Sequence, residues 1–117
     1  MNPKGYVVIQ EEDAQIRELL EQWLREAGYL VARHEAVLET APSLVIVNVP
    51  EPHAADGVIR SIKGVYAAPI LALSARFRRG LAGSVEAARR LGVKKVLPKP
   101  FTRKELLAAV RESVGAA

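Results

Sequence analysis

The chain has 117 residues, of which 50% are hydrophobic and 26% are charged, and its formal net charge is +4 at pH 7. This length suits one domain, and the composition is typical of a globular protein without the ~18 consecutive apolar residues of a membrane helix. The absence of cysteine excludes disulfides and thiolate metal sites, and His34 and His53 have no familiar metal-site spacing. We therefore expect a single cytoplasmic domain over residues 1–117, with no signal peptide and no output domain.

Hydrophobic periodicity divides the first half of the chain into strands and helices. Apolar residues between Ile16 and Ala27 recur at helical spacing, and Gly28 is a typical helix stop. Residues 44–48 are apolar on both faces, like a parallel strand covered by helices on each side. The pattern predicts strands at Tyr6–Ile9, Tyr29–Arg33 and Leu44–Asn48 and helices at Asp13–Ala27 and His34–Thr40.

The second half continues the same alternation. Asp56 is expected to cap a third helix that ends near Lys63 before Gly64, and Thr102 with Glu105 forms a capping box for the last helix, which runs to about Val114. The pattern also predicts strands at Ile70–Leu73 and Val93–Leu97, the latter at a sheet edge because of its two lysines, and a fourth helix through Val85, Ala88 and Leu91. Five strand-helix alternations indicate a doubly wound α/β domain with a parallel sheet.

Polar side chains follow several of the apolar runs. Glu11 and Glu12 come after the first strand, Asn48 ends the third, Ser74 follows the fourth and Lys99 follows the fifth. The carboxyl ends of parallel strands meet at one edge of an open α/β sheet. The sequence therefore predicts a pocket that contains two carboxylates, an amide, a hydroxyl and an ammonium.

The order of these motifs resembles the receiver domain of two-component response regulators over nearly the whole chain. The matching segments are Ile16-Arg17-Glu18-Leu19-Leu20, Ala27-Gly28-Tyr29, Pro42-Ser43-Leu44-Val45-Ile46-Val47, Asp56-Gly57, Leu73-Ser74-Ala75 and Lys99-Pro100-Phe101. The resemblance implies a flavodoxin-like, five-stranded parallel sheet with strand order 2-1-3-4-5. It further implies that Glu11 and Glu12 stand where the family holds Mg²⁺, Asn48 where an aspartate is phosphorylated, and Ser74 and Lys99 where the phosphoryl group is bound.

Two of these positions depart from the family pattern in their chemistry. Asn48 has no ionised oxygen near neutral pH, so it cannot accept a phosphoryl group as an aspartate does. The acidic residues are glutamates, and we expect Lys99 to pair with one of them while Asn48 hydrogen-bonds to the other or to Ser74. Val96 stands where receivers commonly carry a switching Tyr or Phe. A metal site is not expected, with weak Mg²⁺ binding by Glu11 and Glu12 as the alternative.

These departures favour a signalling module that acts through protein contacts without phosphorylation and without enzyme activity. The expected surface for a protein partner is formed by the fourth helix, fifth strand and fifth helix, and a homodimer through the same surface is a further expectation. Six basic residues lie there: Arg89, Arg90, Lys94, Lys95, Arg103 and Lys104. One alternative is a conventional response regulator that keeps a metal-binding acidic pocket in a phosphorelay. The other is a nucleic-acid-binding module that uses the basic residues of the second half, including Arg76, Arg78 and Arg79. Scarce aromatic residues argue against it.

Overall fold

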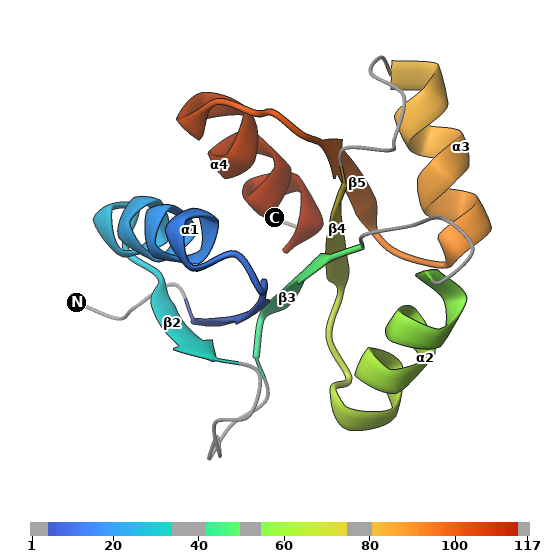
Figure 1. Cartoon of the computed structure of the whole chain (residues 1–117), viewed down its shortest axis with the longest axis horizontal. Coiled ribbons are helices and arrows are strands. Elements are labelled where there is room, and N and C mark those ends of the chain that lie inside the picture. Colours follow the sequence, from blue (N-terminus) through green and yellow to red (C-terminus); the bar gives the residue numbers. More distant parts are fainter. Residues whose placement is uncertain (1–4, 34–41, 50–54, 75–80, 115–117) are drawn as a thin grey trace.

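The computed structural model describes residues 5–33, 42–49, 55–74 and 81–114, and these form a central parallel sheet with helices on both faces (Figure 1). The strands are β1 Tyr6–Gln10, β2 Leu30–Arg33, β3 Leu44–Asn48, β4 Ile70–Ser74 and β5 Lys95–Pro98. The helices are α1 Ala14–Glu26, α2 Ala55–Val65, α3 Leu81–Leu91 and α4 Arg103–Ser113. The order β2-β1-β3-β4-β5, with every neighbouring pair parallel, confirms the predicted fold class.

Several predicted boundaries are corrected. Asp56 does not cap α2 but lies in its first turn, and the helix continues through Gly64 to Val65. An aspartate is favourable both as an N-cap and in the first turn, where it interacts with the helix dipole. The residue type alone therefore did not distinguish the cap position from the first turn. Strand β5 begins two residues later than predicted and includes Pro98. The predicted helix over His34–Thr40 lies outside the described residues, so the fourth and fifth predicted helices are α3 and α4.

Helix α1 begins one residue later and ends one residue earlier than predicted, because Asp13 and Ala27 are its caps. The Asp13 side chain accepts hydrogen bonds from the backbone N–H groups of Gln15 and Ile16, at 2.9 and 3.2 Å. Such a cap satisfies amide donors that have no partner inside the helix. Leu20 is fully buried, whereas Leu19, which the periodicity placed on the same stripe, is 42% exposed.

Helix α4 has the predicted capping box. The backbone N–H of Glu105 donates to Thr102 Oγ1 at 3.1 Å, and the backbone N–H of Thr102 donates to Glu105 Oε1 at 2.9 Å. Leu106 and Val110 on this helix are buried against the sheet. The box therefore fixes where the helix starts, and the apolar residues fix which face it presents to the core.

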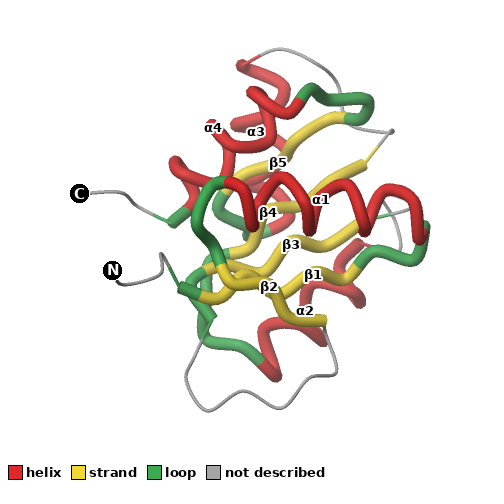
Figure 2. Tube along the Cα trace, turned by 90° about the vertical axis from the view of Figure 1, so that its left-hand side faces the viewer, coloured by secondary structure: helices red, strands yellow, loops and turns green. Residues whose placement is uncertain are grey.

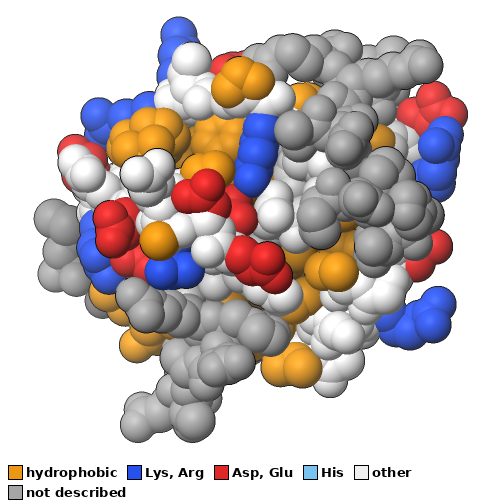
Figure 3. Space-filling view, in the orientation of Figure 1, with side chains coloured by type: hydrophobic (Ala, Val, Ile, Leu, Met, Phe, Trp, Pro, Cys, Tyr) orange, Lys and Arg blue, Asp and Glu red, His pale blue; other side chains and the backbone are white. Residues whose placement is uncertain are grey.

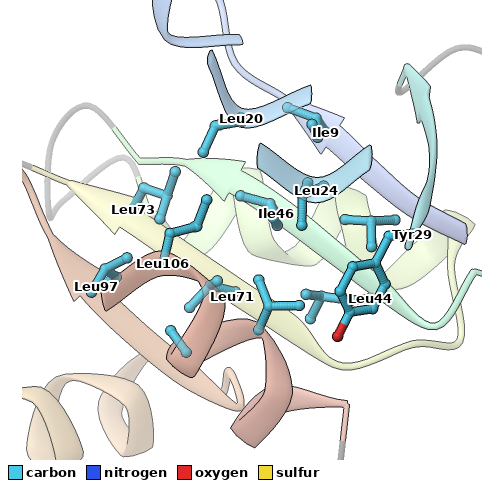
Figure 4. Close-up of a cluster of buried hydrophobic side chains, with 13 residues drawn as sticks. Ile9, Leu20, Leu24, Tyr29, Leu44, Ile46, Leu71, Leu73, Leu97 and Leu106 are labelled. Carbon is cyan, nitrogen blue, oxygen red and sulfur yellow. The ribbon is translucent and has the colours of Figure 1, made fainter. Parts of the chain in front are cut away.

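The hydrophobic core has two layers, one on each side of the sheet (Figure 2). The larger layer lies beneath α1 and α4 and includes Leu24, Ile46 and Leu106 (Figure 4). Trp23 borders it, with its ring 6.4 Å from that of Phe101 in an edge-to-face arrangement. The second layer lies beneath α2 and α3. Among the described helices none has the length and apolar character needed to cross a membrane.

Candidate functional site

The candidate site lies at the carboxyl ends of the strands. Neighbouring parallel strands pair Asn48 with Leu73 and Ser74 with Pro98, which brings the ends of β3, β4 and β5 to the same edge of the sheet. Strand β1 pairs with β3 up to Gln10, so Glu11 emerges beside this edge. The predicted convergence of strand-end polar residues is therefore present in the fold.

Three of these residues are joined by a single ammonium. Lys99 Nζ donates to Glu11 Oε1 at 2.7 Å and to Asn48 Oδ1 at 2.8 Å. The Lys99 side chain is 17% exposed and the Glu11 side chain 2%. A buried carboxylate without a partner would be costly, and the ammonium offsets its charge at hydrogen-bonding distance.

The rest of the Glu11 residue is held from the start of α1. Its second carboxylate oxygen, Oε2, accepts a long hydrogen bond of 3.4 Å from the backbone N–H of Asp13. Its backbone carbonyl accepts a hydrogen bond of 3.1 Å from Arg17 Nη1. Both carboxylate oxygens and the carbonyl are therefore engaged by this chain's own donors.

Side-chain alternation along the strands explains why Glu11 and not Glu12 reaches the site. Ile9 points into the core beneath α1 and α4, and Glu11 continues that alternation two residues later. Ile46 lies in the same core layer, and Asn48 continues its alternation from β3. Glu12 falls on the other alternation and is exposed. The geometry of two strands thus selects one carboxylate and one amide.

The structure bears on each predicted residue of the site. The expected pairing of Lys99 with one glutamate is present, and the partner is Glu11. Asn48 Oδ1 accepts a hydrogen bond from Lys99, whereas the expected partner of Asn48 was the second glutamate or Ser74. Ser74 lies at the same edge and is 1% exposed. The contact of Arg17 with the Glu11 carbonyl was not predicted, although the place of Arg17 in the first turn of the helix after Glu11 was an available signal.

Val96 occupies a different environment from these polar groups. Its side chain is 1% exposed and belongs to the core layer beneath α2 and α3. The valine therefore works as a core residue at a position where the resemblance implied a mobile aromatic side chain.

The residues at this edge do not fit a magnesium site in their observed arrangement. Mg²⁺ needs near-octahedral oxygen ligands at about 2.0–2.1 Å, and it usually takes one or two of them from carboxylates. Glu11 already uses both oxygens, Asn48 supplies a neutral oxygen that Lys99 occupies, and Glu12 is exposed. Within the described ranges there is no group of three or more Asp, Glu, His or Cys residues able to hold a metal ion.

A second feature is a groove of about 360 Å³ where α3, β5 and α4 meet. Its apolar residues are Val85, Ala88 and Val93, and its charged residues are Arg89, Lys94, Lys95 and Glu112. Arg90 follows Arg89 on α3 and pairs with Glu86 at 2.9 Å. The predicted basic surface is therefore divided, because Arg103 and Lys104 lie at the start of α4, where Arg103 approaches Glu26 of α1 at 3.9 Å.

Comparison with known proteins identifies similar chains. No family model matches this sequence. The transcriptional regulatory protein PdtaR of Mycobacterium tuberculosis is 36% identical over 118 residues, an alignment that covers 92% of this chain and 56% of PdtaR. The chain thus spans little more than half the length of that relative.

Solved structures show the same fold. A response regulator receiver protein from Burkholderia phymatum superposes with a TM-score of 0.72 at 24% identity, over 99% of this chain and 98% of that one. The receiver domain of the sensor histidine kinase PA1611 from Pseudomonas aeruginosa, solved with a magnesium ion in its active-site cleft, gives a TM-score of 0.65 at 23% identity, over 96% and 98% of the two chains. The fold of this chain is that of receiver domains.

Proposed function

We propose that this chain, a receiver domain of the response-regulator type, signals through protein contacts without being phosphorylated at its strand-end position. The observation that carries the proposal is the side chain at the end of β3, which is the amide of Asn48. Phosphoryl transfer to a side chain needs an anionic oxygen nucleophile and a divalent cation to offset charge. An amide oxygen supplies neither a nucleophile nor an anionic metal ligand.

The contacts around Lys99 support the same view. Its ammonium lies between the Glu11 carboxylate and the Asn48 oxygen, so the positive charge of the site comes from the protein itself. A phosphoryl group would bring negative charge that attracts the ammonium away from these oxygens. Without that charge the three side chains keep one arrangement, and the site acts as a fixed support for the β5–α4 turn.

Signalling then depends on which surface partners contact. We propose two contact surfaces, the groove face of α3 and β5 and the start of α4, because each carries exposed basic residues. Exposed charges of one sign steer oppositely charged partners and increase association rates.

The test is incubation with acetyl phosphate and Mg²⁺, followed by intact-mass measurement of the unmodified chain and of Asn48→Asp. We expect no phosphoryl adduct on the unmodified chain. In Asn48→Asp an adduct is expected, because the carboxylate restores both the nucleophile and the anionic metal ligand that the amide lacks. A stoichiometric adduct on the unmodified chain that disappears in Ser74→Ala would refute the proposal.

Calorimetric titration with Mg²⁺ separates the conventional alternative from this proposal. A phosphorylatable response regulator with a working acidic pocket would bind Mg²⁺ at millimolar concentration or below, and would lose that binding in Glu12→Ala. We expect no saturable binding by the unmodified chain, because Lys99 already occupies the oxygens of Glu11 and Asn48.

A further inference from the structure

We propose that the groove between α3, β5 and α4 binds helix α1 of a second copy of this chain, in a head-to-tail contact. The proposal concerns self-association and does not depend on whether the strand-end site is phosphorylated. It follows from three observations: the chemistry of the groove, the chemistry of the solvent face of α1, and the positions of the two on the fold.

The groove combines an apolar surface with positive charge. Val85 of α3 lines the groove and is 48% exposed, so an aliphatic side chain of a partner would bury it. Arg89 and Lys94 are exposed on the same groove and form no ion pair with the acidic residues of the described ranges. An occupant of the groove is therefore expected to carry an aliphatic group flanked by carboxylates.

The molecule already shows a carboxylate bound in this groove. Glu112 of α4 forms an ion pair with Lys95 of β5, and both residues line the groove. The Lys95 and Glu112 side chains are 31% and 61% exposed. An exposed ion pair of this kind contributes little to stability. It shows that a carboxylate fits beside Lys95 while the groove stays open.

Helix α1 offers the complementary chemistry. Leu19 is 42% exposed on its solvent face, beside the exposed Glu18. Glu12 and Asp13 are exposed just before the helix starts. Acidic side chains gather over the α1 side of the molecule in Figure 3, with a few basic ones among them. The helix therefore presents one large aliphatic residue, with the Glu18 carboxylate beside it and two further carboxylates before its first turn.

A symmetric contact through the groove face is disfavoured by the same charges. In a two-fold dimer each surface patch meets its own copy. Arg89, Arg90 and Lys94 of one chain would then approach the same residues of the other, and like charges at close range are repulsive. A contact between the groove and α1 instead joins opposite charges.

The placement of the two surfaces determines the kind of assembly. Helix α1 covers one face of the sheet near β2 and β1, whereas α3 covers the other face beside the edge strand β5 (Figure 1). Since the two surfaces lie on different sides of the molecule, a bound copy leaves its own groove open. Such heterologous contacts add further copies in a chain or close into a ring.

The test uses analytical ultracentrifugation of three variants over a wide range of protein concentration. The groove variant is Arg89→Glu/Lys94→Glu and the helix variant is Glu18→Lys/Leu19→Ser. The control is Arg60→Glu, which reverses an exposed basic residue of α2 outside both surfaces. We expect the unmodified chain and the control to associate, and each of the first two to associate at least about tenfold more weakly. Association should also weaken at high salt, which screens exposed charges.

Mixing the variants distinguishes the contact from its alternatives. The groove variant keeps an intact α1 and the helix variant keeps an intact groove, so an equimolar mixture should form one-to-one pairs and nothing larger. A symmetric groove dimer would instead leave the helix variant fully dimeric by itself. That result, or an unmodified chain that stays monomeric at every concentration, would overturn the proposal. Circular dichroism of each variant confirms that the fold is kept.

Discussion

Replacing Lys99 by methionine removes the ammonium that joins the ends of three strands while keeping an unbranched side chain. The change deletes the hydrogen bonds to Glu11 and Asn48 and leaves the Glu11 carboxylate, 2% exposed, without its counter-charge. Removing one partner of a fully buried ion pair costs about 3–5 kcal/mol. Because the Lys99 side chain is 17% exposed and water can partly replace it, we expect a loss of about 2–4 kcal/mol in the free energy of unfolding.

The loss should be visible in both chemical and thermal unfolding. For a domain of this length, 1 kcal/mol corresponds to roughly 4 °C in Tm, so Lys99→Met should melt about 8–16 °C lower. Urea unfolding followed by circular dichroism gives the free energy directly. The matched control is Lys95→Met, which breaks the exposed pair with Glu112 and should cost no more than about 1 kcal/mol.

A double-mutant cycle then separates the ion pair from general packing. Glu11→Gln removes the buried charge, so adding it to Lys99→Met should recover much of the lost stability, with a coupling energy of about 1–3 kcal/mol. If Lys99→Met and Lys95→Met cost the same, or if the two substitutions at the strand-end site were additive, the account of Lys99 as the internal counter-charge would be refuted.

Three further predictions concern elements outside that ion pair. Burial raises the pKa of Tyr29 above its ordinary value of 10.0, against an opposing effect of Arg111. The contribution of the neutral Tyr29 phenol to folding stability is therefore present below pH 10 and is lost as pH rises through the folded-state pKa. Urea titrations at alkaline pH should therefore show a smaller loss of stability in Tyr29→Phe. Thr102→Ala removes the capping box of α4 and should cost about 1 kcal/mol by thermal unfolding, whereas Thr102→Ser should cost much less. Val96→Tyr inserts a ring at a 1% exposed core position and should destabilise by about 1–3 kcal/mol, while a Tm no lower than that of the unmodified chain would mean that the site has room for it.

The sequence predicted those features that depend on neighbouring residues in the chain. The capping box of Thr102 and Glu105 lies within four residues, and its two hydrogen bonds are present as expected. The apolar run of β3 likewise predicted a buried central strand, and residues 44–47 are fully buried. Local chemistry settles such features because few other conformations satisfy the same donors and apolar surfaces.

Features that depend on contacts between distant segments could be predicted only in part. The sequence indicated that Lys99 would meet a glutamate but did not choose between Glu11 and Glu12, since the choice depends on where the alternation of β1 ends. Leu19 was assigned to the buried stripe of α1, yet it is 42% exposed. The apolar stripe of α1 that the periodicity defines is wider than the part of the helix surface that packs on the sheet, and Leu19 lies at its exposed margin.

The contact between Trp23 and Phe101 makes the fluorescence of this chain sensitive to the position of the turn before α4. Trp23 is the single tryptophan, and its edge-to-face neighbour lies two residues after Lys99 in the turn that leads into α4. Indole fluorescence is sensitive to the position of an adjacent ring, so emission from one residue would follow movement of that turn without any attached dye. Constant emission during partner binding would show that Lys99 holds this turn in place, whereas a change in emission would show that the turn moves.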